Sequence, residues 1–280
     1  MGPGNLGTAL ALTLSSAGYK VKSIAIRSAS KQPRAAGALA RRLGAQLIRL
    51  GKQPLEGDII WITVPDDSIA DVACYLSEIG DWKGKTVFHS SGALTSDELE
   101  PLRSRGARVA SMHPMMTFVR GQVPRMQGVA FGLEGDAPAV RMARSIIANL
   151  GAKAFVIAKE NKVLYHVLGS FASPLLIALL ATMDRVAVAA GIRKQDVRAV
   201  TTPLLRQTLN NYLKRGAANA FSGPLVRGDA ATVRKHLAAL ERLPLPGEVY
   251  RTLARSASRY LPVKNHAAIE QGLKAKTIGP

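Results

Sequence analysis

Cysteine is almost absent from this sequence, which limits the chemistry that the chain can carry. Cys74 is the single cysteine, so an intramolecular disulfide and a cysteine-rich metal site are both excluded. Such a composition is typical of a reducing compartment, and we expect a cytoplasmic location. The five histidines lie far apart in the sequence, without the short spacings of a zinc site, so we expect no metal.

Acidic and aromatic residues are also scarce. Lys and Arg number 38 against 19 Asp and Glu, which gives a formal charge of +19 at pH 7. A basic surface favours anionic partners such as nucleotides, nucleic acid or acidic lipid. The six Phe, six Tyr and two Trp do not alternate with basic residues as in surfaces that stack bases, so nucleic acid is the less favoured partner.

No hydrophobic run is long enough for an ordinary membrane span. The longest uncharged apolar stretch covers residues 167–183 and is interrupted by Gly169, Ser170, Ser173 and Pro174. A membrane span needs roughly 20 strongly apolar residues. We therefore expect this stretch to be a buried helix of a soluble core, and we expect no membrane partner.

Short apolar runs alternate with helical patterns in the first part of the chain. Runs typical of strands cover residues 21–26, 59–64, 86–89, 109–112, 129–133 and 154–157. Helical patterns cover residues 8–17, 34–43, 69–79, 96–104 and 138–150. Strands that alternate with helices predict crossover units and an α/β doubly wound parallel sheet of the Rossmann type.

The strand signal stops near residue 158, and only helical patterns follow. These cover residues 160–190, with a bend at Pro174, then 195–214, 229–242 and 248–260. Gly191 and Asp229 are expected to cap the end of one helix and the start of another. The tail from Pro262 is expected to be weakly ordered. The pattern predicts two domains, a Rossmann-like one over 1–158 and an all-α one over 159–280.

A glycine-rich turn stands at the start of the chain. Gly2-Pro3-Gly4-Asn5-Leu6-Gly7 fits the pattern G-x-G-x-x-G and is followed at once by a helical pattern. The glycines allow a tight turn, a close approach to a pyrophosphate and close packing of helix and strand. The helix N-terminus offers N–H groups to the phosphates. We predict that Gly2, Gly4, Asn5, Leu6 and Gly7 bind a dinucleotide.

The strand that should precede this turn is missing, because only Met1 stands before it. In a doubly wound sheet this strand is central, and its loss would expose the pairing edges of two neighbours. We hypothesise that the natural protein starts upstream of Met1, or that the chain is a truncated product.

The residues after the second apolar run indicate which dinucleotide binds. NAD enzymes place an acidic residue there, but the first acidic residue of this chain is Glu56. Arg27 and Ser28 stand at that position instead, and a guanidinium can hold a 2′-phosphate. We predict NADP(H) as the cofactor, with Val64 and Pro65 facing the nicotinamide. A solvated basic face and a plain strand-ending turn are the alternatives.

Several segments together resemble a known family. They are GPGNLGTAL, WITVPDDSIADV, FHSSGAL, SMHPMMTF, YHVLGSFASPLL and SGPLVRGDAATVRKHL, in this order. They resemble a bacterial family in which a Rossmann-like domain precedes a helical domain of unknown function, related to pyrroline-5-carboxylate reductase and to 6-phosphogluconate and 3-hydroxyacid dehydrogenases. The resemblance implies a nicotinamide-dependent reductase or dehydrogenase, often dimeric through the helical half. Pro174 departs from it, since that position often carries Asn.

His166 is the first candidate for proton transfer. It stands on the first helix after the α/β part, where the related dehydrogenases keep a catalytic polar residue. Lys162 and Ser173, at i−4 and i+7, are expected to share its helix face and form the rest of the catalytic set, whereas Tyr165 points elsewhere. A histidine satisfied in a core or an interface is the alternative.

Candidates for substrate binding follow two strands and precede a later helix. Ser91 and Gly92 match the serine region that binds substrate in hydroxyacid dehydrogenases. His113 lies in a His-Pro-Met segment similar to one in prephenate dehydrogenases. Arg227 could meet an anionic substrate, or could pair with Asp229 beside a helix start.

The leading hypothesis is an NADP(H)-dependent oxidoreductase that reduces a small, anionic imine or keto substrate and forms a homodimer. A prephenate-like or 3-hydroxyacid dehydrogenase is the alternative within enzymes. A protein that senses NADP(H) without catalysis is the alternative outside them.

Overall fold

The structure is a computed structural model, and it describes residues 1–27, 33–51 and 55–274. The chain divides into two compact units, Met1–Ser173 and Pro174–Pro280. The first unit therefore extends beyond residue 158, where the sequence pattern places the boundary. The reason is that helix α6 (Lys162–Ala172) contacts the sheet through its first turns, as described below.

Seven strands of the first unit lie in two sheets among the described residues. The smaller sheet pairs β1 (Ser23–Ile26) with β2 (Gln46–Arg49) in parallel. The larger has the order β3-β4-β5-β6-β7. Its strands are β3 (Ile59–Ile62), β4 (Thr86–His89), β5 (Arg108–Pro114), β6 (Ala130–Gly135) and β7 (Lys153–Val156). All neighbours are parallel except β5 and β6, which run antiparallel and pair His113 with Gly132.

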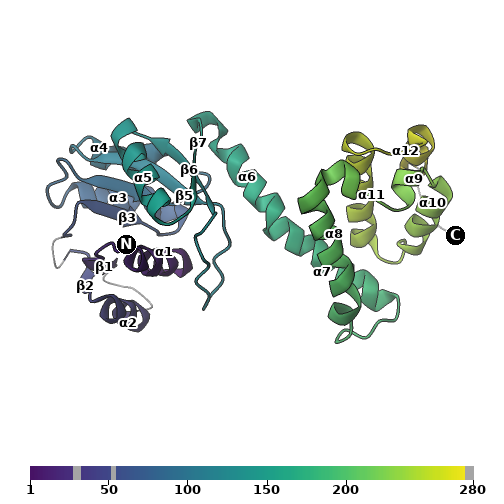
Figure 1. Ribbon diagram of the computed structural model, residues 1–280, viewed down its shortest axis with the longest axis horizontal. Helices are drawn as coiled ribbons and strands as arrows, with labels where there is room; N and C mark the ends of the chain where they lie inside the picture. Colours follow the sequence, from purple (N-terminus) through teal and green to yellow (C-terminus); the bar gives the residue numbers. More distant parts are fainter. Residues whose placement is uncertain (28–32, 52–54, 275–280) are drawn as a thin grey trace. The chain divides into compact units, whose positions relative to one another are not determined.

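Helices cover both faces of these sheets (Figure 1). They are α1 (Asn5–Ser16), α2 (Pro33–Leu43), α3 (Ile69–Ser77), α4 (Glu100–Arg103), α5 (Ala137–Asn149) and α6, with short 3-10 turns at Asp66–Ser68, Ser96–Leu99 and Lys159–Asn161. One apolar core joins α3 and α4 to β3 and β4, and a second joins α1 and α5 to β5 and β6. The predicted α/β Rossmann-type fold is confirmed, apart from β2, which the sequence analysis missed, and the reversed β6.

The second unit is all helical in its described part. It contains α7 (Pro174–Ala189), α8 (Val197–Ala220), α9 (Pro224–Arg227), α10 (Ala230–Ala239), α11 (Pro244–Tyr260) and α12 (His266–Lys274). Gly191 ends α7 with a positive φ of 91°, and the Asp229 side chain accepts the Thr232 N–H at the start of α10, so both caps are confirmed. The prediction of a weakly ordered tail from Pro262 is wrong as far as Lys274, because Ile269 and Leu273 of α12 are buried.

The apolar stretch at residues 167–183 corrects another expectation. It forms the end of α6 and most of α7, and it is not buried: Leu168, Phe171 and Ile177 are 60%, 66% and 63% exposed. One helical stretch of the described chain, residues 159–189, is long and apolar enough to cross a membrane by length and composition. The expectation of a buried core helix is therefore wrong for the described residues of the single chain, which leave this stretch exposed.

Candidate functional site

The glycine-rich turn has the geometry that a phosphate-binding turn needs. Gly2 takes a positive φ of 80°, and Gly4 stands before the first residue of α1 with open space around its Cα. A Cβ on Gly7 would lie 2.6 Å from the Gly2 carbonyl oxygen and would also overlap the Thr63 hydroxyl. The helix can therefore approach β3 closely only with glycine at this position. The first N–H groups of a helix have no partner within it, so those of α1 are available to a phosphate at this turn.

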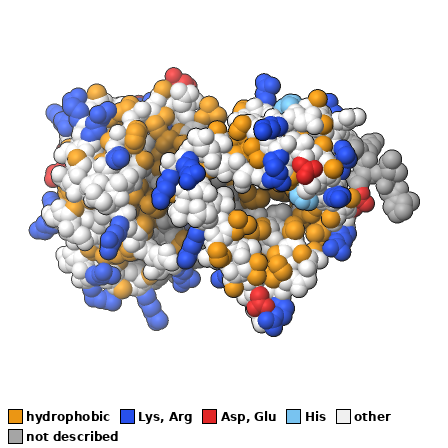
Figure 2. All heavy atoms as spheres, turned by 45° about the vertical axis from the view of Figure 1, so that its right-hand side comes forward, with side chains coloured by type: hydrophobic (Ala, Val, Ile, Leu, Met, Phe, Trp, Pro, Cys, Tyr) orange, Lys and Arg blue, Asp and Glu red, His pale blue; other side chains and the backbone are white. Residues whose placement is uncertain are grey.

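Arg27 follows β1 and lines a pocket of about 320 Å³. Its other lining residues are Leu50, Ser68, Asp71, Val72 and Tyr75. Arg27 is exposed, so its guanidinium is open to an anion. Ser28, the second residue predicted to hold a 2′-phosphate, lies outside the described residues. On the face of the molecule drawn in Figure 2, Lys and Arg side chains are many and acidic ones are few.

The segments after β3 and β4 are joined by a hydrogen bond between side chains. The Ser91 hydroxyl donates to Asp66 Oδ2 at 2.7 Å and accepts the N–H groups of Ala93 and Leu94. Asp66 follows Val64 and Pro65, which lie in the turn after β3. The Asp66–Ser91 bond thus holds the predicted nicotinamide-facing segment against the predicted substrate-binding segment.

Lys162 is a buried cation beneath the Ser91 segment. Its side chain is 1% exposed, and its Nζ donates to the Ser91 carbonyl oxygen at 3.1 Å and to the Ser111 hydroxyl at 2.6 Å. Burial lowers the pKa of Lys162, while the negative charges of Glu134 and Asp66 oppose that shift. Helix α6 therefore places a positive charge directly below the ends of β4 and β5.

Two imidazoles meet above Gly92. The rings of His113 and His166 are 5.7 Å apart and nearly perpendicular. A Cβ on Gly92 would lie 2.9 Å from His113 Nε2 and would overlap the His166 ring. Burial and the nearby charges of Lys162 and His166 lower the pKa of His113 to about 4, so this ring is neutral near pH 7. His166 is exposed and is thus the open polar group of the cluster.

Tyr165 fixes His113 from the other side. Its hydroxyl accepts the Gly132 N–H at 3.1 Å and donates to the His113 carbonyl oxygen at 3.2 Å. The two rings pack edge to face with centroids 5.5 Å apart. The prediction that Tyr165 points away from the site is therefore wrong. Because β6 pairs Gly132 with His113, one hydroxyl can reach both strands.

Two buried polar residues support the cluster from below. His89 Nδ1 accepts the Ser91 N–H at 3.1 Å, and His89 Nε2 donates to the Thr95 carbonyl oxygen at 2.9 Å. Burial lowers the pKa of His89 to about 4, in agreement with this neutral form. The Glu134 carboxylate accepts both the N–H and the hydroxyl of Ser96.

Two predicted site residues stand apart from the cluster. Ser173 caps the C-terminus of α6, and its N–H donates to the Gly169 carbonyl oxygen. Arg227 is the last residue of α9 in the second unit, where its charge helps to lower the pKa of Asp229 after the hydrogen bonds from Thr232. Neither joins the contacts described above, and their proposed roles stay predictions.

The sequence analysis missed Asp66, Ser111 and Glu134. Asp66 had a usable signal, because it follows a predicted strand at the edge where ligands bind. Ser111 and Glu134 lie within buried strands, where a single polar residue gives no sign of its partner.

Two family models account for most of the chain. Residues 1–114 match a Rossmann-like domain, and residues 129–257 match a domain of unknown function, DUF2520. No curated protein matches the chain.

Several solved structures are similar over nearly the full length. A Thermotoga maritima protein is 25% identical, with a TM-score of 0.71 over 96% of this chain and 97% of that one. A Bacteroides fragilis protein described as a candidate NADP oxidoreductase is 20% identical, with a TM-score of 0.75 over 91% and 95%. An imine reductase from Myxococcus stipitatus, in complex with NADP⁺, is 18% identical, with a TM-score of 0.64 over 98% of each chain. These similarities establish the fold.

Proposed function

We propose that this chain, which joins a Rossmann-like domain to a DUF2520 domain, is an NADP(H)-dependent oxidoreductase that reduces a small imine or keto substrate. One observation carries the proposal. The glycine-rich turn, the Asp66–Ser91 pair and the His113–Gly92–His166 cluster all lie where strands of the first unit end. Ligands of open α/β sheets bind at this edge.

The cofactor proposal rests on the turn and on Arg27. Gly2, Gly4 and the N-terminus of α1 would hold the pyrophosphate, and Arg27 in its pocket would hold the 2′-phosphate of NADP(H). Asp71 lines the same pocket and would repel that phosphate unless it faces the ribose hydroxyls. The similar fold of an imine reductase that binds NADP⁺ supports this choice.

The cluster can hold a substrate and supply a proton. NADP(H), when bound, supplies the hydride that reduces a C=N or C=O bond. His166 is the exposed group of the cluster and is positioned to give the proton that the reduced nitrogen or oxygen needs. Lys162 holds the Ser91–Gly92 backbone in place, and its charge favours an anionic substrate.

The exposed apolar faces of α6 and α7 support a homodimer as a second proposal. Val163, Leu164 and Leu168 of α6 and Leu175 and Ile177 of α7 are all at least 49% exposed. Figure 2 shows apolar side chains gathered on the surface of the second unit. Each helix thus exposes several large apolar side chains, and a second copy of the chain offers a matching face that could cover them.

The test is NADPH oxidation with a panel of cyclic imines and 2-keto acids. We expect turnover on at least one class, and we expect His166→Ala to lower kcat by about 10²-fold, as for the loss of a general acid. Lys153→Ala, an exposed position on β7, is the control and should retain full activity. Binding of NADPH without turnover on any substrate would favour the sensor alternative. Turnover in the oxidative direction only, on prephenate or a 3-hydroxyacid, would favour the dehydrogenase alternative.

A further inference from the structure

The segment between β5 and β6 crosses the start of α1. Residues 115–125, which we call the strap, leave the sheet where β5 ends and descend beside α1 (Figure 1). A side chain attaches the strap there: Asn5, the first residue of α1, donates from Nδ2 to the Phe118 carbonyl oxygen at 3.1 Å. Phe118 itself packs against the apolar core that joins α1 and α5 to β5 and β6. The backbone of the strap therefore passes close to the glycine-rich turn.

The strap is anchored at both ends and exposed between them. The Met115 N–H donates to the Ala130 carbonyl oxygen at 2.8 Å, and Met126, directly after the strap, is 2% exposed. All residues of the strap are described, and they form neither helix nor strand. The position of its middle therefore depends on the bond from Asn5 and on the packing of Phe118.

Arg120 stands at the tip of a tight turn within the strap. The Gln122 N–H donates to the Val119 carbonyl oxygen at 3.1 Å, and Gly121 has a positive φ of 80°. These features fit a type II turn, which needs a positive φ at its third residue. Arg120 is the second residue of this turn, and it is exposed. Because two residues span at most about 7 Å of chain, Arg120 stays near the attached Phe118.

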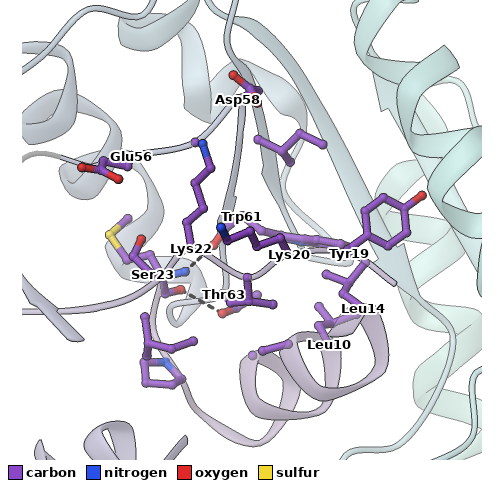
Figure 3. Close-up of a pocket in the computed structure, with 18 of the residues that line it drawn as sticks. Leu10, Leu14, Tyr19, Lys20, Lys22, Ser23, Glu56, Asp58, Trp61 and Thr63 are labelled. Carbon is purple, nitrogen blue, oxygen red and sulfur yellow. Dashed lines mark hydrogen bonds between the residues drawn. The ribbon is translucent and has the colours of Figure 1, made fainter. Parts of the chain in front are cut away.

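The glycine-rich turn offers N–H groups but has no charged side chain of its own. Residues 1–16 contain no Lys, Arg, His, Asp or Glu. The Thr63 hydroxyl donates to the Met1 carbonyl oxygen at 2.8 Å and so holds the turn from the side of β3 (Figure 3). Lys20 and Lys22, labelled in the same view, precede β1 and stand at the opposite end of that strand from the turn. A pyrophosphate in this turn therefore needs a cation from another segment.

We propose that Arg120 binds the pyrophosphate of the coenzyme, and that the Asn5–Phe118 bond holds the strap over the glycine-rich turn for this purpose. The proposal rests on the proposed function, because it assumes a dinucleotide in that turn. A guanidinium can donate two parallel N–H bonds to a phosphate, and such charge-assisted bonds are short and strong. Arg27 lines a separate pocket, assigned above to the 2′-phosphate, so the two arginines serve different groups of one coenzyme.

Calorimetric titration with NADPH and NADH tests the role of Arg120. Arg120→Gln should weaken the binding of both coenzymes to the same extent, by about tenfold, because the pyrophosphate is common to both. Arg125→Gln is the matched control: it removes the same charge from an exposed position of the strap, and it should leave both affinities unchanged. The loss in Arg120→Gln should shrink at high salt, which screens an exposed charge pair.

Trypsin cleavage after Arg120 tests the attachment of the strap. Saturating NADPH should slow this cleavage in the wild type, because the bound pyrophosphate engages the side chain that trypsin must reach. In the protein without coenzyme, Asn5→Ala should speed the cleavage, because the strap loses the bond that holds its middle. Equal rates in Asn5→Ala and the wild type would show that this bond does not hold the strap, and would contradict the proposal.

The titrations separate failure of this proposal from failure of the proposed function. Unchanged affinity of Arg120→Gln for both coenzymes would overturn the role of Arg120 and leave the proposed function standing. A loss for NADPH alone, or an equal loss in Arg125→Gln, would overturn it as well. If neither coenzyme binds the wild type, the proposed function fails, and inorganic pyrophosphate becomes the probe. Slower cleavage after Arg120 with pyrophosphate would then support the anion site, and an unchanged rate would contradict it.

Discussion

At the scale of single residues, the main feature is the buried positive charge of Lys162 at the edge of the larger sheet. Lys162 is buried, yet it donates to Ser91 and Ser111 and lies near the carboxylates of Asp66 and Glu134. A buried charge of this kind is tolerated only when its donors are satisfied and opposite charge is near. We therefore propose Lys162 as a positioning residue beneath the segment that is predicted to bind substrate.

We predict that Lys162→Met lowers kcat by about 10²-fold or more, because the Ser91–Gly92 segment loses the donor that fixes it. The wild type should also lose activity at alkaline pH as Lys162 loses its proton through a lowered pKa, whereas the variant should lack this limb. The pH profiles of kcat for both proteins check this. A normal alkaline limb in Lys162→Met would contradict the assigned role.

His89 and His113 predict how stability depends on pH. The pKa of each is about 4 in the folded protein and 6.5 when unfolded, so the unfolded state binds more protons between these values. The stability that the neutral rings contribute is complete above pH 6.5 and is lost as pH falls toward 4. Each should lower the free energy of unfolding by about 2 kcal/mol between pH 7 and pH 5.

Urea unfolding at both pH values measures this loss. His113→Gln removes one titrating ring, so its free energy of unfolding should fall less than that of the wild type. A wild-type value that is the same at pH 5 and pH 7 would show that the two rings are not buried in neutral form.

At the scale of elements, one helix and two strand ends build the cluster. Helix α6 can approach the end of β4 because Gly92 has no side chain, and it reaches β6 through Tyr165. Sequence reasoning found Gly92, His113 and His166 because each follows a strand or begins the long helix. It missed the role of Tyr165 because helix spacing alone does not show that a strand reverses and brings Gly132 beside His113.

We predict that Gly92→Ala lowers kcat/KM by at least about tenfold, since the added Cβ would displace the His166 ring. Gly37→Ala is the matched control: it lies within α2, and the nearest atom to its Cβ would be 3.7 Å away. The control should keep full activity and unfold no more easily than the wild type. Steady-state kinetics with thermal unfolding separates the two. Equal kinetics in both variants would show that the approach of His166 to Gly92 is not needed.

The strands and helix caps of the fold could be predicted from the sequence where the local signal is clear. The runs at β3 and β4 and the caps at Gly191 and Asp229 are local signals and appear as expected. Strand β2 was missed because Gln46 and Arg49 flank only two apolar residues. Its strand conformation comes from pairing with β1, which is a contact distant in sequence.

At the scale of the whole molecule, the main feature is two exposed apolar helix faces that a partner could cover. The faces of α6 and α7 expose apolar side chains that the sequence pattern predicted to be buried. An amphipathic pattern shows that a face prefers burial, and it does not show whether the same chain or another one covers it.

We predict that the wild type is a dimer in solution and that Leu168→Glu combined with Phe171→Glu makes it monomeric, because a buried interface would have to desolvate two carboxylates. Light scattering after gel filtration measures both masses. Tyr260→Glu, at an exposed position of α11, is the control and should stay dimeric. A monomeric wild type that binds lipid vesicles would assign these faces to a membrane surface.

The most direct test of the central claim is calorimetric titration with NADPH and NADH. The account predicts that the wild type binds NADPH more tightly than NADH, and that Arg27→Ala loses about tenfold or more in NADPH affinity with little change for NADH. An equal loss for both coenzymes would contradict the assignment of Arg27 to the 2′-phosphate. The absence of heat with either coenzyme on folded protein would contradict the dinucleotide site itself.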